Sequence, residues 1–149
     1  MSLETDAWIH VGHILGFVLW VGGLLAVAAL LRAHEGADAA SRPGIVGIAR
    51  STAVLMDVGA TLTIALGLIM AFKSPMFPNT AFKTGGWLHV KLALVVVGII
   101  VPHAVLRRRI AALKREAKPG PLARWIVPVL LLAAVAIIAL GANPFLLRK

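Results

Sequence analysis

The sequence predicts an all-α integral membrane protein: a four-helix transmembrane bundle with both termini on the outer side of the membrane. Three observations lead to this fold class. Of the 149 residues, 60% are hydrophobic and the mean hydropathy is +0.93, whereas soluble domains are typically about 45–50% apolar. The apolar residues form four long stretches separated by polar connections. Basic residues are concentrated in two of those connections.

Each apolar stretch is long enough to form a helix that crosses a bilayer, which takes about 20 residues for about 30 Å of hydrocarbon. We expect residues 1–149 to form a single membrane domain, with spans at about 7–31, 45–72, 86–106 and 122–142. Small residues recur inside the first two spans, at Gly12 and Gly16 and again at Gly59 and Gly67. Such residues allow helices to approach closely, so we expect these two spans to pack against each other or a neighbour through them.

The orientation follows from the distribution of Lys and Arg. The first and third connections, with the adjoining helix ends, carry ten basic residues, and the opposite side carries four. Basic residues accumulate on the cytoplasmic side of membrane proteins, so these connections are predicted to lie inside. We therefore interpret the net charge of +9 as a topology signal that also contacts lipid headgroups, and we expect no nucleic-acid partner.

The third span carries three ionisable side chains, His89, Lys91 and His103. Ionisable groups at membrane depth are costly and usually face the interior of a bundle. Fourteen residues separate the two histidines, which at about 100° per residue is about 40° short of four full turns. We therefore expect both imidazoles on one face, about 21 Å apart along the axis.

The chain contains no cysteine, which excludes disulfides, thiolate ligands and iron–sulfur clusters and leaves histidine as the strong ligand. In the first span, His10, His13 and Trp20 lie on one stripe. The first and third helices run in the same direction, so His13 and His89 are predicted at similar depth, as two axial ligands of one haem. His13 as a satisfied bundle histidine, and His10 as an interfacial histidine or the competing ligand, remain alternatives.

The inner histidines, His34 and His103, are weaker candidates for a second site. We expect His103 to lie at the level of Val27 of the first helix. His34 is expected in a solvated loop about seven residues further along the chain than Val27. Copper or zinc could also use two or three of the five histidines, but the lack of cysteine and of outer carboxylates makes a closed tetrahedral site less favoured.

Asp57 is a carboxylate inside the second apolar span, so it must be protonated, paired or in contact with water. Three interpretations remain open: a proton relay, a partner for a histidine N–H, or a packing acid hydrogen-bonded to Thr61. Lys91 has two interpretations. Its amine reaches the interface by snorkelling, or it binds a carboxylate, either a porphyrin propionate or that of Asp57.

Two of these patterns resemble the HemJ-type protoporphyrinogen oxidases. The first span carries a histidine followed by Trp-x-x-Gly-Leu, at His13 and Trp20–Leu24, and a further histidine at His34. The third span carries Gly-Trp-Leu-His-Val-Lys-Leu at Gly86–Leu92, followed by His103, and it is similar to the family's Gly-Trp-Leu-His-x-Lys-Leu motif. The resemblance covers about residues 10–106 and is strongest in the third span.

The resemblance implies a small multi-pass protein of the bacterial inner membrane that binds haem b and oxidises protoporphyrinogen IX to protoporphyrin IX in haem biosynthesis. On this basis the cofactor would contact His13, His89, Trp20 and Lys91, and the catalytic residues would be Lys91 and Asp57. Partners would be membrane lipid, a tetrapyrrole substrate, and a second copy of the chain or a redox partner in the membrane.

Three other functions use the same residues. A non-enzymatic b-type cytochrome would bind haem without oxidising a porphyrinogen. A copper-handling protein would resemble the membrane domain of the CopD copper-resistance proteins. A structural subunit would keep its histidines merely hydrogen-bonded. The sequence does not separate the oxidase from the cytochrome, because both need the same ligands.

Overall fold

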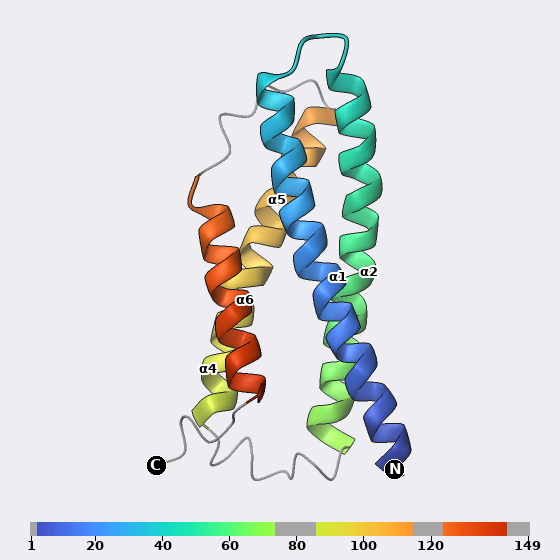
Figure 1. The fold of residues 1–149 in the computed structure, drawn as a ribbon, viewed down its shortest axis with the longest axis vertical. Helices are drawn as coiled ribbons and strands as arrows, with labels where there is room; N and C mark the ends of the chain where they lie inside the picture. The colour runs from blue at the N-terminus through green and yellow to red at the C-terminus, as the bar shows by residue number, and fades with distance from the viewer. Residues whose placement is uncertain (1–2, 74–85, 115–123, 143–149) are drawn as a thin grey trace.

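The computed structural model describes residues 3–73, 86–114 and 124–142, and in these the chain is all-helical (Figure 1). Four helices are present in this part of the chain, and the third is interrupted by one π-helical turn. The elements are α1 (Leu3–Gly36), α2 (Arg42–Lys73), the third helix formed by α4 (Gly86–Val95), η1 (Val96–Ile100) and α5 (Val101–Lys114), and α6 (Ile126–Ala142). The predicted helical fold class is confirmed.

Three helices are long and apolar enough to cross a membrane, over Glu4–Gly36, Arg42–Phe72 and Leu88–Leu113, and Ile126–Gly141 is a shorter apolar helix. Several apolar helices in one chain indicate a multi-pass membrane protein. Three helices extend beyond the predicted spans, whereas α6 begins at Ile126, four residues later than predicted. α1 continues to Gly36, because no Gly or Pro interrupts it earlier in its last turns. His34 therefore lies in the last turn of α1 and not in a loop.

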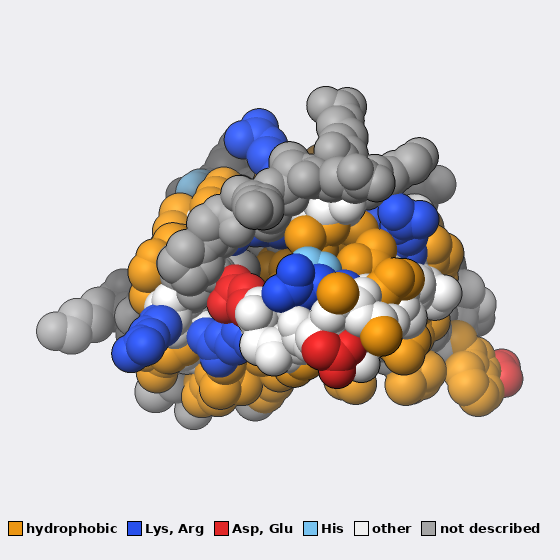
Figure 2. Space-filling view, turned by 90° about the horizontal axis from the view of Figure 1, so that it is seen from above, with side chains coloured by type: hydrophobic (Ala, Val, Ile, Leu, Met, Phe, Trp, Pro, Cys, Tyr) orange, Lys and Arg blue, Asp and Glu red, His pale blue; other side chains and the backbone are white. Residues whose placement is uncertain are grey.

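The connection between α1 and α2 is five residues long and is organised by Asp38. The carboxylate of Asp38 accepts hydrogen bonds from the backbone N–H of Ser41 at 2.8 Å and from its hydroxyl at 3.2 Å. The backbone carbonyl of Asp38 accepts from the N–H of Arg42 at 3.3 Å. Asp38 thus satisfies donors that a helix start leaves unpaired, as an N-cap residue does. Charged side chains gather at this end of the bundle, with hydrophobic side chains around its margin (Figure 2).

The helices α1 and α2 pack closely along much of their length through glycines. A Cβ placed on Gly16 would lie 2.9 Å from the backbone nitrogen of Thr63, and one on Gly59 would lie 2.5 Å from the backbone nitrogen of Trp20. A Cβ on Gly23 would lie 2.8 Å from the Cβ of Met56. Only glycine permits backbones to approach this closely, so the predicted small-residue packing of these two spans is confirmed.

The π-helical turn changes which way the second half of the third helix faces. The N–H of Val101 bonds the carbonyl of Val96, five residues earlier. Pro102 has no N–H to offer to the carbonyl of Gly98, which favours such a bulge. The π-turn accommodates one extra residue, so the 14 residues from His89 to His103 rotate about the helix axis as about 13 α-helical residues would. That rotation is about 220° beyond three full turns.

The two histidines therefore do not share a face. His89 is exposed, whereas His103 is only part-exposed and is hydrogen-bonded to a residue of α1. The prediction that both imidazoles lie on one face of the third helix is wrong, because a straight α-helix was assumed where the chain forms a π-turn.

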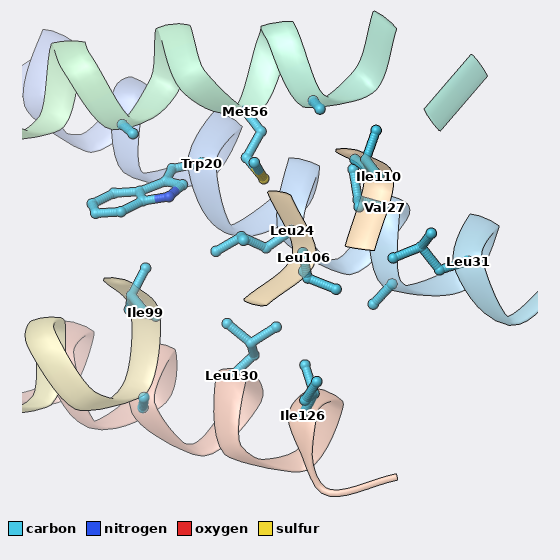
Figure 3. Close-up of a cluster of buried hydrophobic side chains, with 14 of the residues drawn as sticks. Trp20, Leu24, Val27, Leu31, Met56, Ile99, Leu106, Ile110, Ile126 and Leu130 are labelled. Atoms are coloured by element: carbon cyan, nitrogen blue, oxygen red, sulfur yellow. The ribbon is translucent and has the colours of Figure 1, made fainter. Parts of the chain in front are cut away.

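The hydrophobic core lies toward the end of the bundle that carries the α1–α2 connection, and all four helices contribute to it (Figure 3). Its largest fully buried side chains include Trp20, Leu24, Met56, Leu106 and Leu130. α6 crosses the third helix at Gly98, where a Cβ would overlap the Cβ of Ala133. This packing fixes Trp20 at the boundary between the core and the other end of the bundle.

Candidate functional site

A cavity of about 380 Å³ lies among the helices at the end of the bundle where the chain begins. This volume is within the range of small-molecule sites, about 300–1,000 Å³. Five lining residues carry the argument below, namely His13, Trp20, Thr63, Gly67 and Lys91. The remaining lining side chains are apolar and come from all four helices. The cavity is therefore an apolar chamber with very few polar groups.

His13 is held in a defined tautomer by α2. Its Nδ1 lies 2.8 Å from the backbone carbonyl oxygen of Thr63. A carbonyl can only accept, so Nδ1 carries the proton and the lone pair is on Nε2. Gly67 makes this approach possible, because a Cβ there would lie 2.9 Å from Cε1 of the imidazole. Histidines that bind metals usually donate their other N–H in this way.

Lys91 is the cationic group of the cavity. Its ammonium approaches α6 at Gly141, where a methyl group would lie 3.7 Å from Nζ. Among the residues that the structure describes, no carboxylate forms an ion pair with it. Two anionic partners were predicted for Lys91, the carboxylate of Asp57 and a carboxylate of a ligand. Asp57 is paired with His103 and Arg107, so the ligand carboxylate remains.

Trp20 forms part of the cavity wall and is 2% exposed. Its indole Nε1 donates a hydrogen bond to Nδ1 of His103 at 3.0 Å, and the two rings meet edge to face with centroids 6.0 Å apart. His103 is thus level with Trp20 and not with Val27, about two turns further along α1. The predicted depth of His103 is wrong, because the third helix crosses α1 at a different level from the one assumed.

Asp57 lies on the other side of His103. Its Oδ1 is 3.4 Å from Nε2 of His103, and its Oδ2 is 3.2 Å from Nη2 of Arg107. Thr61 donates to the backbone carbonyl of Asp57 at 2.9 Å and not to its carboxylate. Of the three interpretations of Asp57, the geometry matches the partner of a histidine N–H. Trp20, His103, Asp57 and Arg107 form a polar network across three helices.

The five histidines are not brought together. His13 lines the cavity, whereas His89 is exposed and is not a lining residue. Both ring nitrogens of His103 face partners in the network. His34 lies at the far end of α1, 21 residues from His13. His10 is half-buried, and its Nδ1 is buried with no hydrogen-bond partner among the described residues.

No group of three or more His, Cys, Asp or Glu side chains within the described ranges could hold a metal ion. Ligation of one haem by both His13 and His89 stays a prediction. The side-chain positions favour His13 as a ligand and do not favour His89.

Sequence reasoning missed two features of the site. The carbonyl of Thr63 fixes the tautomer of His13, and Gly67 leaves room for the imidazole to reach that carbonyl. A pattern of side chains in the sequence cannot predict a hydrogen bond to a backbone carbonyl. Arg107 was assigned to topology alone, although it follows His103 by four residues and so lies on the same helical face. That spacing was the available signal that Arg107 also faces Asp57.

The described residues define an all-helical membrane protein whose apolar chamber is lined by one histidine and one lysine of this part of the chain. The chain is distantly homologous to protoporphyrinogen IX oxidase of Helicobacter pylori. With the strain J99 protein it shares 26% identity over 146 residues, which is 93% of this chain and 94% of the relative. With the strain 26695 protein it shares 28% identity over 112 residues, 73% of this chain and 72% of the relative. No family model and no solved structure matches.

Proposed function

We propose that this chain is a haem b-binding membrane oxidoreductase that acts on protoporphyrinogen IX, as its bacterial relatives are named for doing. Homology over nearly the whole chain supports this function. The single structural observation that carries it is the hydrogen bond from His13 Nδ1 to Thr63, which leaves Nε2 as a lone-pair donor beside an apolar cavity. We place both termini on the outer side of a bacterial inner membrane, from the distribution of basic residues.

The residues that line the cavity fit a haem. His13 would hold the iron through Nε2, and the Thr63 carbonyl would keep the imidazole oriented and increase its basicity. Lys91 would bind a propionate, which supplies the anion that its ammonium lacks among the described side chains. When bound, haem supplies one-electron redox chemistry at a potential set by its axial ligands and surroundings.

Protons released from a porphyrinogen must also leave an apolar site. Asp57 presents Oδ1 to the Nε2–H of His103 and Oδ2 to the guanidinium of Arg107, and both the carboxylate and the guanidinium are partly exposed. We assign proton transfer toward the basic end of the bundle to this Asp57. The distance of 3.4 Å from Oδ1 to Nε2 is slightly longer than the about 2.6–3.2 Å of direct proton transfer, and such contacts often shorten only when the substrate is bound.

The test is an optical spectrum of the detergent-purified protein, oxidised and dithionite-reduced, with a pyridine haemochrome assay and an assay of protoporphyrinogen oxidation. We expect near-stoichiometric haem b, lost in His13→Ala. His89→Ala is the matched control and should retain haem if His13 is the single ligand in the cavity. Loss of haem in both variants would instead support ligation by His13 and His89 together. No haem after expression with ample haem supply would exclude the proposed function.

Haem without porphyrinogen oxidation would identify the chain as a b-type cytochrome. Copper handling has no three-ligand cluster to support it in residues 3–73, 86–114 and 124–142, and metal analysis of the haem-free protein tests it directly.

A further inference from the structure

The cavity wall divides into a buried part and an exposed part. The buried part includes Trp20, Met70 and Ile137, which are 2%, 8% and 5% exposed. Other lining residues are largely exposed although they also face the cavity. They are Ile64, Leu68, Phe72, Leu92, Val96 and Ile100, which are 45%, 53%, 68%, 47%, 51% and 38% exposed. A residue that lines a cavity and is half exposed marks an opening of that cavity.

Among the described residues, the exposed lining residues come from two helices, α2 and the third helix. Each helix contributes three of them at intervals of four residues, namely Ile64, Leu68 and Phe72 on α2 and Leu92, Val96 and Ile100 across α4 and η1. The opening therefore lies between α2 and the third helix. Figure 1 shows α4 and the end of α6 diverging from α1 and α2 at this end of the bundle.

The opening faces sideways. Its six exposed lining residues are all apolar, and they belong to helices that are long and apolar enough to cross a membrane. An aqueous opening at a bundle end would carry polar side chains at its rim, because water stabilises them there. A rim of Leu, Ile, Phe and Val instead matches the hydrocarbon of the bilayer.

The interior of the cavity carries polar groups that its rim lacks, namely His13, Thr63 and the ammonium of Lys91. The ammonium has no ion-pair partner among the described residues. An unpaired cation in an apolar environment is costly, and it is stabilised by an anion that it can bind directly. Charge complementarity thus selects a ligand with an acidic group that ends deep in the cavity and an apolar body that can pass through the rim.

We propose that the cavity loads from the bilayer, through the opening between α2 and the third helix, with a membrane-dissolved amphiphile whose carboxylate binds Lys91. The identification of that amphiphile as a tetrapyrrole rests on the proposed function. The route itself does not require iron or its ligation, so the two can fail separately.

The experiment uses the full chain in phosphatidylcholine vesicles and metal-free protoporphyrin IX as the probe, delivered from a second vesicle population. Porphyrin fluorescence reports binding. The chain has no cysteine, so Leu68→Cys with Leu92→Cys provides the only two thiols. A flexible, reducible bis-methanethiosulfonate linker then ties the two sides of the opening together. Val54→Cys with Val58→Cys, two exposed positions on α2 that do not line the cavity, is the matched control.

We expect the linker to slow porphyrin binding by about tenfold or more in Leu68→Cys/Leu92→Cys, as gating of an access route does. Reduction should restore the rate, and the linked control pair should bind normally. An unchanged rate with the linker in place would overturn the lateral route. If the linker does not form, Leu68→Trp with Leu92→Trp narrows the same opening and is judged by the same criterion against Val54→Trp.

The ligand class has its own test. Lys91→Met should weaken binding of protoporphyrin IX about tenfold or more and leave its dimethyl ester unaffected, because only the free acid can pair with the ammonium. Equal affinities of the variant and the native chain for the free acid would overturn the assignment of the carboxylate. Porphyrin uptake that depends on the opening, in a protein that binds no haem, would leave the route standing and remove the haem function.

Discussion

The indole N–H of Trp20 in α1 donates a hydrogen bond to Nδ1 of His103 in α5 at 3.0 Å, and the two residues are 83 positions apart in the chain. This bond decides the tautomer of His103, because an indole N–H can only donate. Nδ1 of the neutral imidazole is then the acceptor, and the proton on Nε2 points to Asp57. The imidazole of His103 thus joins Trp20, in the wall of the cavity, to the carboxylate of Asp57 in the middle of α2.

Trp20→Phe should destabilise the protein, because it removes the hydrogen bond and leaves a cavity where the larger indole ring is buried. Bonds of this kind inside membrane proteins contribute about 0.6 kcal/mol on average and about 1.7 kcal/mol at most. The measurement is the thermal unfolding midpoint in detergent. Trp125→Phe, at an exposed position before α6, is the control and should not change the midpoint. An equal effect of both substitutions would show that the bond contributes nothing specific.

Asp57→Asn should reduce porphyrinogen oxidation while leaving the haem content unchanged. The amide keeps the shape of the side chain but cannot take up a proton, and groups that transfer protons contribute about 10²–10⁴-fold to rates. Activity is measured per bound haem. Thr61→Val is the control on the same helix, since its hydroxyl bonds only the backbone carbonyl of Asp57. Full activity of Asp57→Asn would remove Asp57 from the proton route.

The fold was predictable from the sequence to the extent that hydrophobicity determines it. Four apolar stretches require four helices, and the glycines of α1 and α2 indicate their close contact. The π-turn at Val96–Ile100 was not predictable from periodicity, because one added residue leaves the composition of the span unchanged. That single residue moved His103 away from the face of His89.

The candidate site was predictable in its residue types and only partly in its geometry. His13, His89, Trp20 and Lys91 were chosen as cofactor-binding residues, and the structure places all of them except His89 on one cavity. His103 was chosen as a ligand, yet it bonds Trp20 and faces Asp57. The difference arises from helix rotation, which a sequence pattern specifies only when the helix is regular.

Gly67→Ala should lower the haem content. Its Cβ would lie 2.9 Å from Cε1 of His13, closer than real Cβ contacts allow, so the imidazole would have to move away from the Thr63 carbonyl. Gly47→Ala is a matched control on α2, because nothing lies within 4 Å of its added methyl group. The haem-to-protein ratio of the two purified variants makes the comparison. Equal ratios would mean that the position of His13 does not matter for the cofactor.

Gly98→Ala should destabilise the packing of α6 on the third helix. The new Cβ would overlap the Cβ of Ala133, and overpacking of this kind typically costs about 1–3 kcal/mol. Gly22→Ala adds the same methyl group to α1 where nothing lies within 4 Å. We expect a lower unfolding midpoint for Gly98→Ala alone. Its rescue by Ala133→Gly, which removes the opposing methyl group, would confirm the cause, and the absence of rescue would contradict it.

The Asp38 carboxylate predicts a pH dependence of stability. Hydrogen bonds from the backbone N–H and the hydroxyl of Ser41 hold the pKa of Asp38 below its ordinary value of 3.8. A carboxyl whose pKa is lowered in the folded state contributes stability above its unfolded pKa, and that contribution is lost as the pH falls through the folded pKa. Its magnitude is small, because Asp38 is exposed to solvent.

Asp38→Ala should therefore lower the thermal unfolding midpoint slightly at pH 7, where the carboxylate is ionised and caps the start of α2. As the pH falls through the lowered pKa of Asp38, the native carboxyl becomes protonated, and the midpoints of the native chain and the variant should approach each other. Asp38→Asn separates the two effects, because its amide oxygen still accepts from Ser41 but does not titrate. Its midpoint should change less than that of the native chain between pH 7 and pH 3. A difference between native and Asp38→Ala that persists unchanged at low pH would show that capping, and not the charge of Asp38, accounts for the effect.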